Sequence, residues 1–168
     1  MLSYERAAGG ALTGKPAQVI LMLMLFAGFN VFAQTVQLNV IKPAIADRDL
    51  VIPIAEITEN AVFYPVDIQG TRLEVIAVKA PDGTIRTAFN TCQVCYGSGR
   101  GFYKQQGTVL VCQNCGNRFR MSQVELRSGG CNPVPIFAAN KRVDDKNITI
   151  PREFLMEAKG IFARWRRS

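Results

Sequence analysis

The feature that most constrains the fold of this chain is a set of five cysteines in a sequence that contains no histidine. Four of them form two Cys-x2-Cys pairs, Cys92/Cys95 and Cys112/Cys115, which are separated by sixteen residues, and Cys131 follows fifteen residues after the second pair. Two such pairs at this separation are typical of a metal site. Each tight turn presents two thiolates on one side, and two facing turns can close four sulfurs around an ion or a cluster.

The absence of histidine excludes several classes of protein. Ser-His-Asp and Cys-His catalytic groups, histidine-ligated zinc enzymes and histidine-ligated haem all need an imidazole. Covalent haem attachment is excluded as well, because Tyr96 and Gly116 occupy the positions where a histidine would have to follow each pair. The glycine-rich stretch at 97–101 lacks the strand–helix context of a phosphate-binding loop. We therefore expect that the chain is not an enzyme and that its cysteines bind a cofactor.

The four paired cysteines allow three interpretations before any family is considered. A structural zinc site needs four tetrahedral thiolates, an iron–sulfur cluster also takes four thiolates, and an exported protein could form two disulfides with one cysteine left over. A disulfide within a Cys-x2-Cys pair closes a very small loop and adds little stability, which favours a metal site. Mononuclear iron and Cu(I) are further options, because soft thiolates suit them too.

Residues 1–33 are predicted to be a signal peptide or a membrane anchor. Two basic residues precede an apolar run at 17–33, and residues 31–33 offer a small-residue cleavage site. The run is seventeen residues long, which is at the short limit for a membrane-spanning helix. The chain is therefore expected either to be exported to an extracytoplasmic space such as a periplasm, or to be anchored in the membrane through residues 17–33. Residues 34–48 are predicted to be a linker.

Residues 49–150 are predicted to form a β domain that binds the metal. Segments rich in β-branched and aromatic residues lie at 49–54, 61–68, 72–78, 84–89 and 108–111, the last within a hairpin that begins at 103. A spacing of about ten residues per strand is typical of a small antiparallel sandwich or barrel. Pro53 and Pro65 lie inside two of these segments, which predicts that those strands are edges or bulged.

Residues 151–168 are predicted to form an amphipathic helix that packs on the sheet. Pro151 suits a first helical turn, and apolar residues recur at helical spacing, namely Phe154, Leu155, Ala158, Ile161, Phe162 and Trp165. Gly160 lowers the helix propensity in the middle of this segment.

The cysteine region resembles a known family. The block NTCQVCYGSGRGFYKQQGTVLVCQNCGNRFRM, followed by GGCNPVPI, is similar to the FtrD-like membrane iron–sulfur family, and the likeness covers roughly residues 50–137. This resemblance implies a membrane-associated iron–sulfur protein that serves an iron-uptake or redox system, with both cysteine pairs as ligands.

The order of strands and loops is also similar to a Rieske domain. Cys92 and Cys112 would match the Rieske cysteines, and Cys95 and Cys115 would stand where Rieske histidines stand. The first loop differs by one residue, and without histidine no true Rieske centre can form. The likeness also implies that the loop around Cys131 lies near the site, where this thiol is an alternative metal ligand, a redox thiol or a buried small apolar residue.

These features together favour a low-potential one-electron carrier. All-thiolate clusters of the ferredoxin type have potentials of about −400 mV, against about −150 to +300 mV for centres with two histidines. The expected partners are membrane-associated redox or iron-transport proteins. The alternative is a non-redox, zinc-ribbon-like interaction module with structural zinc or Cu(I). The net charge of +7 would also suit nucleic acid, but the export signal argues against that partner.

Overall fold

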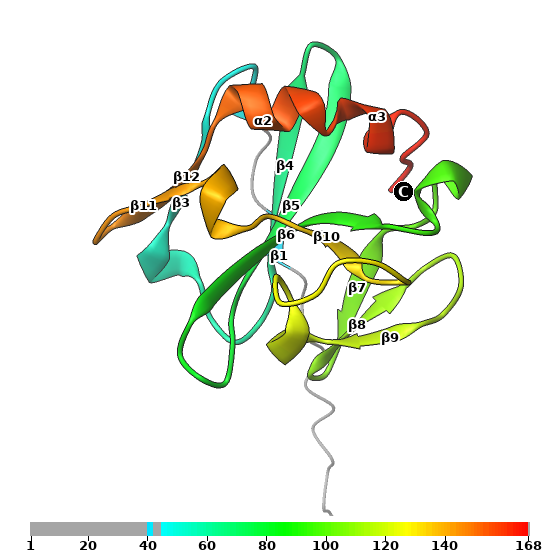
Figure 1. Ribbon diagram of the computed structural model, residues 1–168, viewed down its shortest axis with the longest axis horizontal. Helices are drawn as coiled ribbons and strands as arrows, with labels where there is room; N and C mark the ends of the chain where they lie inside the picture. Colours follow the sequence, from blue (N-terminus) through cyan, green and yellow to red (C-terminus); the bar gives the residue numbers. More distant parts are fainter. Residues whose placement is uncertain (1–39, 42–44, 168) are drawn as a thin grey trace, which may run out of the picture. The chain divides into compact units, whose positions relative to one another are not determined.

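The regular structure of the protein is mainly β (Figure 1). The computed structural model describes residues 40–41 and 45–167. The prediction of a mainly β fold with antiparallel sheets is confirmed. The predicted signal peptide or anchor at 1–33, with its hydrophobic helix, lies outside the described residues. Within the described part, no helix is both long enough and apolar enough to cross a membrane.

The largest sheet has six strands, and the first cysteine pair begins at the end of one of them. Its order is β1 (Val40–Ile41), β4 (Val62–Ile68), β5 (Thr71–Lys79), β6 (Ile85–Cys92) and β10 (Pro133–Pro135), and β2 (Ile45–Ala46) also pairs with β4. Consecutive strands from β4 to β10 are antiparallel, whereas β1 and β2 run parallel to β4, which the sequence did not predict. Gln69 and Gly70 form the β4–β5 turn, with φ of 51° and 74°. Two positive φ values are what a tight hairpin turn of matching twist needs.

Two three-stranded sheets complete the domain. One has the order β11 (Arg142–Val143), β12 (Asn147–Ile150) and β3 (Leu50–Pro53), so that Leu50 pairs with Ile150. The other is a meander of β7 (Tyr103–Gln106), β8 (Val109–Cys112) and β9 (Arg118–Arg120), and the second cysteine pair begins at the end of β8. Short 3-10 helices lie in the connections, namely η1 (Ile54–Glu56), η2 (Tyr96–Ser98), η3 (Met121–Gln123) and η4 (Ala138–Asn140).

The two prolines within predicted strands have different outcomes. Pro53 is the last residue of β3, which is the edge strand of its sheet as described, and that prediction is confirmed. Pro65 lies in β4, which is an interior strand, so the prediction of an edge is wrong for this segment. The parallel pairings of β4 with β1 and with β2 stop on either side of Pro65, at Phe63 and at Val66. The missing N–H therefore falls in the gap between two short pairings.

The main sheet is buried on both faces, because alternate residues of β5 point into two different apolar clusters. Leu73 and Val75 belong to a cluster that also contains residues of the C-terminal helices, and Ile76 and Val78 belong to a second cluster. This second cluster, which we call the cysteine-side cluster, includes Cys92, Cys95, Cys112, Tyr103, Leu110 and Phe119. A sheet covered on both faces reads as a nearly continuous apolar run, which explains the sequence of β5.

The C-terminal segment is helical over a shorter range than expected. It forms α2 (Arg152–Glu157) and α3 (Lys159–Phe162), which meet at Ala158, and the helical structure ends at Phe162 rather than near residue 168. The apolar residues of the predicted stripe, including Leu155 and Phe162, pack on the main sheet as expected. Beyond Phe162 the chain is no longer helical, because its polar groups form hydrogen bonds with other parts of the protein.

Residues 164–167, which we call the C-terminal strap, make these contacts. The indole N–H of Trp165 donates to the carbonyl of Asn90 at 2.9 Å, and the backbone N–H of Arg166 donates to the carbonyl of Gly99 at 2.8 Å. Arg167 forms a salt bridge with Glu74, a fully buried carboxylate that also accepts a hydrogen bond from the Asn90 amide. Figure 1 shows the chain end beside the loop that follows β6. The strap thus ties the C-terminal segment to the strand that carries Cys92.

Candidate metal centre

The first cysteine pair begins at the last residue of β6. The N–H of Cys92 donates to the carbonyl of Gly101 at 2.7 Å, which folds the intervening loop back on itself. A Cβ atom on Gly101 would lie 2.8 Å from the backbone carbon and oxygen of Cys95, so only glycine allows this close approach. Cys92 is completely buried and Cys95 is 8% exposed.

The second pair begins at the last residue of β8 and repeats this design. The N–H of Cys112 donates to the carbonyl of Asn117 at 2.9 Å, and the N–H of Gly116 donates to the carbonyl of Cys112 at 2.9 Å. Gly116 has φ of +74°, a conformation that glycine adopts without strain. Cys112 is buried and Cys115 is exposed, so this loop, like the first, opens from the core towards solvent.

All five thiols come together. The sulfur atoms of Cys92, Cys95 and Cys112 lie within 4.8 Å of one another, and so do those of Cys95, Cys115 and Cys131. The two triads share Cys95, and the Sγ atoms of Cys115 and Cys131 are 3.9 Å apart. All five cysteines are free. The sequence motifs indicated these five residues as candidate ligands. The structure places them in one continuous group, which is buried at one end and exposed at the other.

The loop around Cys131 is held against the first pair by the sheet. Pro133 of β10 pairs with Cys92, and the N–H of Gln93 donates to the carbonyl of Asn132 at 3.0 Å. The Gln93 side chain accepts the N–H of Gly129 at 2.7 Å. These contacts place the half-buried Cys131 beside the site.

The backbone of Cys131 is fixed from the other side as well. Its carbonyl accepts the Tyr103 hydroxyl at 2.8 Å and the Asn117 amide at 2.9 Å. Tyr103 belongs to β7 and Asn117 follows the second pair, so both donors come from the meander. The loop is therefore bound to both halves of the site.

Backbone N–H groups are aimed at the first cysteine of each pair. Burial would raise the pKa of Cys92, but hydrogen bonds to its sulfur hold the pKa below its usual value. The donors are the Tyr103 hydroxyl, whose single proton is shared with the Cys131 carbonyl, and the N–H groups of Val94 and Cys95. Burial raises the pKa of Cys112 to about 12, although its sulfur accepts the N–H groups of Asn114 and Cys115, the matching positions of the second loop. Hydrogen bonds of this kind stabilise a thiolate, which is the form that binds metals.

The remaining thiols differ in their surroundings. A hydrogen bond from the N–H of Asn117 is the main cause that lowers the pKa of Cys115. Burial raises the pKa of Cys95. For Cys131 the hydrogen bond with Cys115, followed by burial, raises the pKa to about 12. The dominant neighbour of Cys131 is thus another thiol, whereas Cys92, Cys112 and Cys115 all accept backbone donors.

Two functional side chains were missed by sequence reasoning. Tyr103 is fully buried in the cysteine-side cluster, and burial together with Cys92 raises its pKa, so that its hydroxyl stays protonated and able to donate. Asn90 is also fully buried, and its side chain accepts the N–H of Tyr103 at 2.6 Å and donates to its carbonyl at 3.3 Å. The signal in the sequence was the polar pair Asn90-Thr91 directly before Cys92, at the end of a strand.

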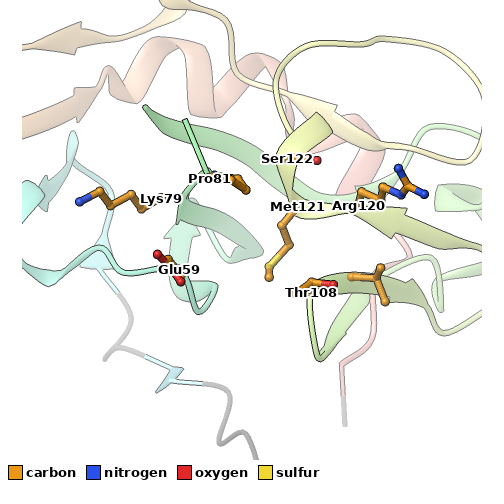
Figure 2. Close-up of a pocket in the computed structure, with 8 residues that line it drawn as sticks. Glu59, Lys79, Pro81, Thr108, Arg120, Met121 and Ser122 are labelled. Carbon is orange, nitrogen blue, oxygen red and sulfur yellow. The ribbon is translucent and has the colours of Figure 1, made fainter. Parts of the chain in front are cut away.

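A separate pocket of about 430 Å³ has no cysteine in its lining (Figure 2). It is lined by Glu59, Lys79, Pro81, Thr108, Val109, Arg120, Met121 and Ser122. The lining contains charged groups of both signs and a methionine, but neither a thiol nor an imidazole. The pocket therefore does not offer the donor set of a thiolate metal centre.

A mainly β domain that brings five free thiols together, with backbone donors aimed at three of their sulfurs, has the donor set of a cysteine-ligated metal protein. The chain belongs to the family described as "Membrane iron-sulfur containing protein FtrD-like", whose model matches residues 57–162. This range includes all five cysteines and extends to the end of α3, so the resemblance seen in the sequence is confirmed. No curated protein and no solved structure matches the chain. The likeness to a Rieske domain stays a prediction.

Proposed function

We propose that this protein is a one-electron carrier whose iron–sulfur cluster is held by Cys92, Cys95, Cys112 and Cys115. The observation that carries the proposal is the convergence of the thiols in two triads within 4.8 Å, in a chain of an iron–sulfur family. Four thiolates are the usual ligand set of such a cluster, and a bound cluster supplies reversible one-electron exchange. No catalytic role is assigned, because the proposed task is to receive and release an electron.

The surroundings of the sulfurs fit this task. Cys92 and Cys112 lie in the apolar cysteine-side cluster, which excludes water from one side of the site. Cys115 is exposed, so the opposite side can approach a partner closely. The N–H donors to Cys92, Cys112 and Cys115 compensate negative charge on the thiolates. Hydrogen bonds to sulfur and solvent exposure are among the factors that set the potential of such centres.

We assign Cys131 to a supporting position rather than to the ligand set. Its sulfur has a thiol as its main neighbour and a raised pKa, and its contacts with the loops run mainly through its carbonyl. A thiol next to Cys115 can still replace it as a ligand, which makes Cys131 the alternative ligand. The proposed partners are membrane-associated redox or iron-transport proteins, and residues 17–33 would attach the domain to the membrane or direct its export.

The proposal is tested by metal analysis of the full chain purified without oxygen. We expect iron together with acid-labile sulfide, visible absorption that bleaches on reduction with dithionite, and an electron paramagnetic resonance signal in the reduced protein. A colourless protein with one zinc per chain would contradict electron transfer and support the structural alternative. Iron without sulfide would indicate a mononuclear centre, which would also contradict the cluster.

Replacing Tyr103 with phenylalanine is expected to lower the reduction potential of the centre. The hydroxyl shares its proton between the Cys92 sulfur and the Cys131 carbonyl, and donation to the sulfur favours the more negative, reduced state. If the hydrogen bond stabilises the reduced state by about 1 kcal/mol, its loss lowers the reduction potential of a one-electron couple by about 40 mV. A redox titration followed by visible absorption measures the change. Tyr64→Phe is the matched control, because Tyr64 lies in the other apolar cluster, and an equal change in both variants would contradict the role of Tyr103.

A further inference from the structure

Three arginines surround a pocket of about 680 Å³ beside the first cysteine loop. Its lining consists of Gly97, Ser98, Arg100, Arg164 and Arg166, and all three arginines are exposed. Arg100 comes from the first cysteine loop, whereas Arg164 and Arg166 come from the C-terminal strap. The pocket therefore exists only because the strap lies across the loop.

The backbone holds these two segments together at Gly99. The N–H of Arg166 donates to the carbonyl of Gly99 at 2.8 Å, and Gly99 has φ of +76°. A Cβ atom at this position would lie 2.2 Å from the backbone oxygen of Arg164, so no other residue fits without displacing the strap. Backbone packing thus holds the three arginines close together even though their positive charges repel one another.

These arginines differ from four others in the described part of the chain. Arg86, Arg142, Arg152 and Arg167 each form a salt bridge with a carboxylate. No carboxylate within the described residues forms a salt bridge with Arg100, Arg164 or Arg166. A concentration of guanidinium groups that no carboxylate of the described residues neutralises is suited to a ligand with several carboxylates or phosphates, which guanidinium groups bind in a bidentate manner.

An apolar groove adjoins the arginine pocket. It has a volume of about 200 Å³ and is lined by Tyr96, Gly97, Gly160, Ile161, Ala163 and Arg164, so Gly97 and Arg164 border both hollows. The first cysteine loop also exposes 43% of Tyr96 and 62% of Val94. Apolar contacts bordered by charged ones are typical of protein interfaces, and a small anion would use only the arginine pocket.

This surface is directly connected to the metal centre. The N–H and the hydroxyl of Ser98 donate to the carbonyl of Cys95 at 3.0 and 2.8 Å. We propose that the arginine pocket and the apolar groove together form a docking site for a protein partner that presents a carboxylate-rich segment with an apolar side chain. The inference rests on the proposed function for its purpose, which is to bring a redox partner to the first cysteine loop, but the binding itself does not depend on the cluster.

The test uses a fluorescein-labelled peptide of glutamates around one leucine and the full chain with its metal bound. Fluorescence anisotropy at low ionic strength is expected to show saturable binding that added salt weakens. The triple variant Arg100→Gln/Arg164→Gln/Arg166→Gln is expected to bind the peptide about tenfold more weakly, since each exposed ion pair contributes a few-fold. Arg100→Gln alone, which leaves the strap unchanged, is expected to weaken binding about twofold.

The control variant Arg48→Gln/Arg127→Gln/Lys146→Gln removes the same charge from exposed positions elsewhere and is expected to bind like the wild type. Absence of peptide binding, or an equal loss in the control, would overturn the docking site. Inorganic pyrophosphate bound as tightly as the peptide would indicate a small-anion pocket instead. Retention by phosphatidylglycerol vesicles through the same arginines would indicate a lipid-facing surface, and this result too would overturn the docking site for a protein partner.

The outcomes for docking and for the proposed function are separable. Protein that contains iron and sulfide but does not bind the peptide would overturn the docking site and leave the proposed function intact. Protein that contains only zinc but binds the peptide through the three arginines would overturn the proposed function and leave the docking site intact.

Discussion

The Cys112→Ser variant is expected to lose the metal centre. Serine has nearly the size of cysteine, so the change removes a thiolate from the buried end of the site and leaves the β8 backbone intact. A tetrahedral set that loses one thiolate has an open position, and we expect the variant to retain less than about a tenth of the wild-type metal. Metal analysis and visible absorption of the purified protein measure this loss.

Cys131→Ser is the matched control for this experiment. It removes a thiol from the same group of five but keeps the Cys131 carbonyl, which makes the hydrogen bonds with Tyr103 and Asn117. We expect this variant to keep the wild-type metal content. If Cys131→Ser loses metal while Cys115→Ser keeps it, the ligand assignment in the exposed triad is wrong and Cys131 replaces Cys115.

The Trp165→Ala variant is expected to destabilise the domain strongly. Trp165 is 9% exposed, packs with its ring edge against Phe102 and Phe162, and donates its indole N–H to Asn90. Truncating a buried tryptophan costs about 3–5 kcal/mol. Urea denaturation of the metal-loaded protein, followed by circular dichroism, measures the change in the free energy of unfolding.

A second variant separates packing from hydrogen bonding at this position. Trp165→Phe keeps an aromatic ring but loses the N–H that satisfies the Asn90 carbonyl, and we expect it to cost about 1–3 kcal/mol. Because the strap also borders the arginine pocket, Trp165→Ala should weaken peptide binding as well. A free energy of unfolding within about 0.5 kcal/mol of the wild type, the range of ordinary surface substitutions, would show that the strap does not stabilise the domain.

Local patterns in the sequence were sufficient to predict the central strands and the cysteines of the site. The segments that form β4, β5 and β6 are rich in β-branched residues and are separated by turn residues such as Gln69-Gly70. Both features involve residues that are close in the sequence. The two Cys-x2-Cys motifs are local in the same sense. The structure brings these thiols together at the ends of β6 and β8, as the spacing indicated.

Features that depend on distant partners were not predictable in this way. β10 has the sequence Pro-Val-Pro, which is not typical of a strand. It nevertheless pairs with β6, because the Cys131 loop places it next to that strand. Tyr103 resembles any aromatic residue of a buried hairpin until Asn90 and Cys131 are placed around it. The end of the helix at Phe162 is set by Gly99 and Asn90, which lie far away in the sequence.

The pairing of Leu50 with Ile150 has a consequence for how the protein matures. This sheet joins segments from opposite sides of the cysteine region, so its formation must wait for a long loop to close, which is slow. The β7–β8 hairpin and the two cysteine turns involve only short-range closures, and these are fast. During synthesis the cysteine turns can therefore form before β3 pairs with β12. Leu50 and Ile150 belong to the apolar cluster on the face of the main sheet opposite the thiols, so this late sheet completes the core without covering the site. We therefore expect that the cofactor can be loaded before or after this sheet forms.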